Sequence, residues 1–176
     1  MQSSKVFVDG QKFLVKQCVA ILRQGIELIE NLDDFSFTRC EDAARSSVGA
    51  HFRHNLDFVT NFLAGMENGK LDYNRRERNL RVETNRDYAA QRFREAVERL
   101  EDLTVETLAK RIFVSSETVE NLFCESSVLR ELEFLQSHTI HHYALIQTKL
   151  ASFGIKVPRD FGVAPSTLEY WKSQAA

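Results

Sequence analysis

A long run of helix-forming residues without glycine or proline extends from about Val128 to Phe153 and has two histidines near its middle. Positions four apart stack on one face of a helix, so His138 and His142 are predicted to lie one turn apart on the same face. His141 is predicted to point to the side of that face. The face is predicted to point inward because it also carries apolar residues: Val128, Leu135, Leu145, Ile146 and Phe153.

Two inward imidazoles one turn apart supply two of the nitrogen ligands that a divalent transition metal needs, and a third must come from another segment. The other histidines of the chain, which has five in all, are His51 and His54 in a second helical stretch. Helical geometry slightly favours His51, which lies among Phe58 and Phe62, over His54 at the edge of that face. A single inward histidine is more often a hydrogen-bonded core residue, but two such clusters together favour a metal site.

Composition limits the class of protein. A chain of 176 residues with 43% hydrophobic and 27% charged residues suits one globular domain, residues 1–176. A net charge of −2 provides no basic face for nucleic acid. No window approaches the roughly 18 apolar residues of a membrane span, and the first residues lack the apolar core of a signal peptide. We therefore expect a cytoplasmic protein that binds neither membrane nor nucleic acid, with its three cysteines reduced.

Apolar residues recur at helical spacing in four stretches, near residues 5–32, 47–67, 86–103 and 127–153. Each stretch has one apolar stripe to bury, which predicts an all-α fold, an up-down four-helix bundle. Residues 103–125 are β-branched and aromatic with partial alternation, so they predict a short irregular or β excursion before the last long helix. The sequence Ser166-Thr167-Leu168-Glu169 is a capping box that predicts a short C-terminal helix.

The polar stretch from Asn68 to Asn85 is long for a connection inside a domain and is rich in arginine. It is interpreted either as a solvated surface loop or as a lid or anion-binding loop, because arginine suits carboxylates and phosphates. His54 lies near the start of its helix, and the loop begins about 20 Å further along. The loop would therefore have to fold back to reach the histidines.

Three segments carry a resemblance to a known family: the run Ser47-Val48-Gly49-Ala50-His51-Phe52-Arg53-His54, the pair His138 and His142, and the tail Asp160-Phe161-Gly162-Val163-Ala164-Pro165-Ser166-Thr167. They resemble the DinB-like (YfiT-like) family of metal-dependent four-helix-bundle proteins. In relatives that keep one of the two helix-two histidines, the second binds metal. The resemblance therefore implies a ligand set of His54, His138 and His142, and it also implies a homodimer.

Members of this family include thiol transferases and hydrolases. The resemblance thus implies a metal-dependent enzyme with a mononuclear three-histidine site, acting on a small molecule such as a low-molecular-weight thiol by thiol transfer or hydrolysis. Three neutral imidazoles leave positions open on the ion, as a catalytic site requires. Zinc or nickel is the expected metal, and iron also suits imidazole ligands. The alternative is a non-catalytic helical bundle with a structural or adventitious metal, acting through self-association or partner binding.

Two further residues are candidates for a catalytic role. Glu131 lies seven residues before His138 on the same face, where it would orient a ligand or act as a general base. The alternative for Glu131 is a boundary carboxylate paired with a basic neighbour or with water. His51, one turn from His54, is a candidate proton shuttle or a replacement ligand. His141 is expected to be exposed or at a helix contact.

Overall fold

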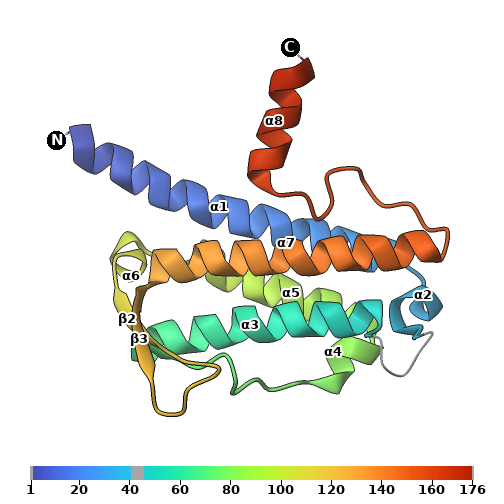
Figure 1. Ribbon diagram of the computed structural model, residues 1–176, viewed down its shortest axis with the longest axis horizontal. Helices are drawn as coiled ribbons and strands as arrows, with labels where there is room; N and C mark the ends of the chain where they lie inside the picture. The colour runs from blue at the N-terminus through green and yellow to red at the C-terminus, as the bar shows by residue number, and fades with distance from the viewer. Residues whose placement is uncertain (1, 41–45, 176) are drawn as a thin grey trace.

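The computed structural model describes residues 2–40 and 46–175 (Figure 1). Four long helices dominate it: α1 (Gln2–Asn31), α3 (Val48–Asn68), α5 (Arg86–Glu101) and α7 (Val128–Ser152). Their ends lie within a few residues of the four predicted stretches. Helix α1 packs against α5 and α7, and α3 packs against the same two helices. The four apolar stripes therefore face one shared core.

Local sequence explains where the long helices begin and end. The Ser47 hydroxyl accepts a hydrogen bond from the Ala50 backbone N–H at the start of α3, and Ser127 does the same for Arg130 at the start of α7. At the other ends, Gly69 and Gly154 have φ angles of 69° and 77°. A residue without a Cβ takes this left-handed conformation at no steric cost, so both helices stop there.

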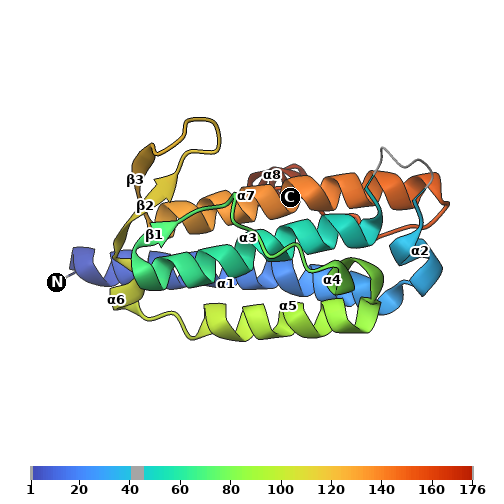
Figure 2. The same ribbon diagram turned by 90° about the horizontal axis from the view of Figure 1, so that it is seen from below.

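The segment between α3 and α5 runs back along the length of α3 (Figure 2). The short helix α4 (Leu80–Thr84), capped by Asn79, lies near the beginning of α3. Consequently α3 and α5 run in the same direction, while α1 and α7 run in the opposite direction. The arrangement is consistent with a four-helix bundle in which the second and third long helices are parallel.

A small three-stranded sheet lies at one end of the helices (Figure 1). Strand β2 (Arg111–Ser115) pairs in parallel with β1 (Lys70–Leu71), in the register Lys70 to Phe113, and in antiparallel with β3 (Phe123–Ser127), in the register Arg111 to Ser127. The predicted β excursion before α7 is thus confirmed. The predicted C-terminal helix is also confirmed, as α8 (Pro165–Ala175). The short helices α2 (Asp34–Thr38) and α6 (Val105–Leu108) were not predicted, because one turn is too short to show helical periodicity.

The core is centred on Phe52, which is fully buried. Its ring contacts Phe37, Phe93 and Tyr143, with centroids 5.8 to 6.1 Å apart. The prediction that Leu145 faces inward is wrong: its side chain is 40% exposed, because the face of α7 buried against α1 and α3 is narrower than the apolar stripe. Among residues 2–40 and 46–175, no helix combines the length and apolarity needed to cross a membrane.

Candidate metal centre

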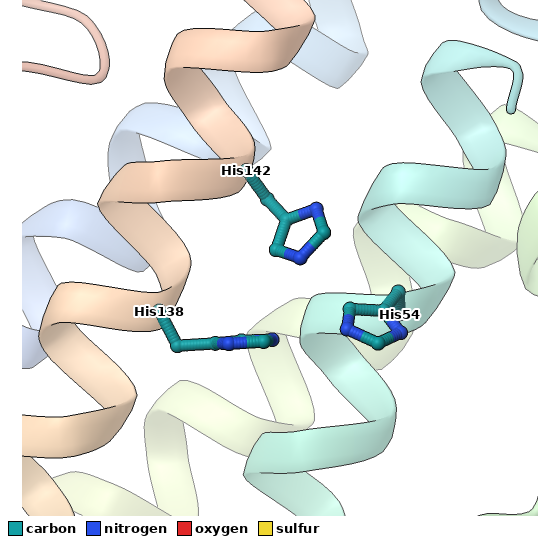
Figure 3. A group of neighbouring side chains, drawn as sticks. All are labelled: His54, His138 and His142. Atoms are coloured by element: carbon teal, nitrogen blue, oxygen red, sulfur yellow. The ribbon is translucent and has the colours of Figure 1, made fainter. Parts of the chain in front are cut away.

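Three histidines converge between α3 and α7 (Figure 3). His54 extends from α3, and His138 and His142 extend from adjacent turns of α7. One ring nitrogen of each lies within 4.8 Å of the others, and all three side chains are partly buried. The ring centroids are 4.5 to 5.0 Å apart. The helix therefore stacks His138 on His142 as the spacing predicts, and the packing of α3 on α7 adds the third ring.

Burial keeps these imidazoles neutral. It is the largest cause that lowers the pKa of His54 and of His138 from 6.5 to about 4, and the pKa of His142 to about 3. The positive charge that neighbouring histidines would carry adds to the effect, chiefly His138 on His54, His141 on His138, and His54 on His142. Neutral imidazole is the form that coordinates metal, so the cluster is in its ligand state at neutral pH.

The residues present fit a divalent transition metal. The Nε2 atom of His138 is buried and has no hydrogen-bond partner among the described residues. A buried polar atom left unpaired is costly, and such an atom calls for an explanation such as an ion. Three imidazole nitrogens facing one point are the donor set of an open zinc, nickel or iron site.

His51 lies beside the cluster and contacts His142. The two Nδ1 atoms are 2.9 Å apart, so one donates and the other accepts a hydrogen bond. Burial is the largest cause that lowers the pKa of His51, followed by the nearby Lys149. His141 is exposed, as expected, and its ring meets the His142 ring edge to face at 5.2 Å. With its Nδ1 engaged by His51, His142 has Nε2 left for a ligand role.

Aromatic rings form one wall of the cluster. The Phe58 ring stacks on His138 at 4.1 Å between centroids and on Tyr73 at 4.8 Å. Phe134 closes the group, with its centroid 5.6 Å from His138 and 5.2 Å from Tyr73. Phe58 and Tyr73 are buried, so this side of the site is shielded from water.

Comparison with known proteins identifies the family. The model of the DinB superfamily matches residues 23–146. The chain belongs to the DinB superfamily. Its members are metal-binding, and the matched region includes all three histidines of the cluster.

Two proteins similar to this DinB-superfamily chain match different shares of its length and of their own. A crystal structure of the DinB-like protein YjoA from Bacillus subtilis superposes with a TM-score of 0.62 at 18% identity, covering 82% of this chain and 94% of that one. At this identity the match concerns the fold. FK506-binding protein 5 of Rhizopus delemar is 29% identical over 179 residues, covering 98% of this chain but 41% of that protein. The chain thus spans less than half the length of that relative.

Glu131 lies on α7, buried away from the histidine rings. Its Oε2 accepts a hydrogen bond from the Tyr73 hydroxyl at 3.0 Å, and its Oε1 accepts one from the Ser126 hydroxyl at 2.6 Å. Within the part of the chain that the structure describes, neither oxygen is hydrogen-bonded to a histidine. In this DinB-superfamily protein, Glu131 therefore ties the segment after α3 to α7, and its contact with the cluster is indirect, through Tyr73 and the rings of Phe58 and Phe134.

The arginine-rich segment folds back onto the site. The Asn61 side chain donates to the Arg75 carbonyl at 2.9 Å, which holds the segment against α3. Arg76 Nη1 then lies 3.3 Å from His54 Nδ1. The distance from His54 to the start of this segment was correctly inferred from the sequence. The path by which the segment returns to His54 was not. Its one sequence signal is the concentration of arginines in a long connection, and this does not distinguish Arg76 from its neighbours.

Proposed function

We propose that this chain is a metal-dependent enzyme with a mononuclear site formed by His54, His138 and His142. It acts on a small molecule by thiol transfer or by hydrolysis. One observation carries the proposal: three neutral imidazoles converge within 4.8 Å, and His138 has a buried nitrogen without a hydrogen-bond partner. Membership in a metal-binding superfamily and the four-helix bundle arrangement support it.

His54, His138 and His142 would hold a divalent ion and leave positions open on it, and the ion would lower the pKa of a water or thiol bound there. The surrounding residues orient the ligands and shield the site. His51 holds the His142 ring through Nδ1, which sets its tautomer and orientation. Phe58 and Tyr73 shield the site, and Glu131 anchors Tyr73. His51 is also the candidate proton carrier, because its ring is in direct hydrogen-bond contact with the cluster.

The metal is proposed to be zinc or nickel, with iron also suited to this donor set. The first experiment is elemental analysis of protein purified without a polyhistidine tag, since a tag and a nickel column would add metal of their own. About one equivalent of ion per chain is expected, and its removal should abolish turnover of low-molecular-weight thiol or ester substrates. Protein without bound metal that also fails to bind added zinc would overturn the proposal.

A second candidate function is self-association without catalysis, with a structural or adventitious metal. It is favoured by apolar side chains on the β2–β3 hairpin that are about half exposed: Phe113, Leu122 and Phe123. The proposed homodimer is consistent with either function. Sedimentation at micromolar concentration tests the dimer. A metal site that accepts no added ligand, together with a stable dimer, would favour this second function over catalysis.

A further inference from the structure

Arg76 lies against the histidine cluster. Its Nη1 is 3.3 Å from His54 Nδ1, and its guanidinium carbon lies 5.1 Å from the centre of the Phe58 ring. Its Nε is buried and has no hydrogen-bond partner in the described part of the chain. Arg76 is thus placed at the cluster by a cation–π contact and one hydrogen bond, with donor capacity left over.

Among residues 2–40 and 46–175, Arg76 makes no direct ion pair with an acidic side chain, although its charge is one of those that counteract the raising of the Asp57 pKa by burial. Some nearby arginines do have such partners. Arg53 pairs with Asp57 at 3.1 Å and with Glu83 at 2.8 Å. Among the described residues, Arg78 and Arg81 also make no ion pair, but Arg76 is the arginine of this segment that lies within hydrogen-bond distance of a cluster histidine.

The contact between Arg76 and His54 is incompatible with a metal on His54. Arginine only donates, so His54 Nδ1 accepts and the ring hydrogen of the neutral imidazole is on Nε2. If the metal takes Nδ1, it replaces Arg76. If it takes Nε2, the ring hydrogen moves to Nδ1, which then cannot accept from Arg76. In both cases metal binding releases the guanidinium from His54 and leaves it beside a divalent cation.

We propose that Arg76 is the anion-binding residue of this site, and that the substrate carries a carboxylate close to the group that binds the metal. The inference rests on the proposed metal site. Two cations this close repel each other, and a carboxylate between them removes the repulsion. A guanidinium fork matches a carboxylate in geometry. A single unpaired arginine suits one negative charge, which favours a carboxylate over the more highly charged phosphate.

The test uses the full chain loaded with cobalt(II), whose absorption spectrum reports ligands, and three small thiols. Mercaptoacetate is anionic, 2-mercaptoethanol is neutral and cysteamine is cationic. The wild type should bind mercaptoacetate most tightly and cysteamine least. Arg76→Gln should weaken the binding of mercaptoacetate by about tenfold or more, the size expected for a charged hydrogen bond, and leave the binding of 2-mercaptoethanol nearly unchanged. Arg75→Gln is the matched control, because the Arg75 side chain is 89% exposed.

A second measurement is direct metal binding by calorimetry. Arg76→Gln should bind cobalt(II) at least as tightly as the wild type, since no contact with His54 has to break. If Arg76→Gln lost affinity for all three thiols equally, or lost no affinity for mercaptoacetate, the inference would be overturned while the metal site stands. A larger Arg76-dependent gain for thiophosphate than for mercaptoacetate would overturn the choice of carboxylate. Failure of the wild type to bind cobalt(II) would instead remove the proposed function, and the inference with it.

Discussion

His51 and His142, from helices that are far apart in the sequence, meet through their Nδ1 atoms at 2.9 Å. The contact leaves Nε2 of His142 to face a ligand. We expect His51→Ala to lower zinc affinity by about tenfold, the scale of a residue that orients a ligand. Isothermal titration measures it, with the exposed His141→Ala as control. A loss as large as that of His54→Ala would instead make His51 a ligand.

The three proposed ligands should behave differently from the other histidines. Replacing His54, His138 or His142 by Ala removes one of three donors, so each variant should lose well over tenfold in zinc affinity. The fold should survive in every variant because the core is centred on Phe52 and not on the histidines. Circular dichroism and zinc titration on the same samples check both points. Full-strength binding by His138→Ala would eliminate the three-histidine site.

The stability of the metal-free protein should depend on pH through the cluster. The pKa values of His54 and His138 are lowered from 6.5 to about 4, and that of His142 to about 3. The unfolded chain therefore binds more protons than the folded chain below pH 6.5. The contribution of these neutral rings is complete above pH 6.5 and is lost as the pH falls through the folded-state values.

Urea unfolding across this pH range measures the effect. A variant with all three residues replaced by Gln is the comparison, because it keeps every other titrating group. Its unfolding free energy should fall less steeply with decreasing pH than that of the wild type. Identical slopes for the two proteins would show that the three rings are not held neutral by the fold.

The close approach of α1 to α7 depends on Gly25. A methyl group there would overlap the buried Tyr143 hydroxyl and crowd the Phe52 ring. We expect Gly25→Ala to lower the free energy of unfolding by about 1–3 kcal/mol, as overpacking does. At Gly10, in the same helix, an added methyl meets nothing within 4 Å. Gly10→Ala should therefore stabilise the protein by about 0.5–1 kcal/mol, and a loss of equal size at both positions would contradict the packing argument.

We expect Glu131 to hold in place the segment that carries Arg76. Tyr73→Phe removes the hydroxyl that donates to Glu131 and leaves a buried carboxylate oxygen without that donor. The free energy of unfolding should fall by about 1–2 kcal/mol, and limited trypsin digestion should cut faster among the arginines that follow. Tyr170→Phe, at a side chain 62% exposed, should change neither. Unchanged protection in Tyr73→Phe would mean that this hydrogen bond does not hold the segment.

Local sequence was sufficient to predict the long helices and two of the three histidines of the site. Helical periodicity and single capping residues such as Ser47 depend on neighbours a few positions away, so the stretches near 5–32, 47–67, 86–103 and 127–153 were recognisable. The same geometry puts His138 under His142 regardless of the rest of the chain. For that reason the histidine pair was predictable from spacing alone.

Only the tertiary structure decided which residues complete the site. The choice between His51 and His54 depends on how α3 rotates against α7. The helical wheel slightly favoured His51 and the family resemblance implied His54; in the structure the cluster contains His54, with His51 beside it. The place of Arg76 depends on hydrogen bonds between residues distant in sequence, from Asn61 to Arg75 and from Tyr73 to Glu131. Such contacts leave no periodic trace, because their partners are brought together only when the helices pack.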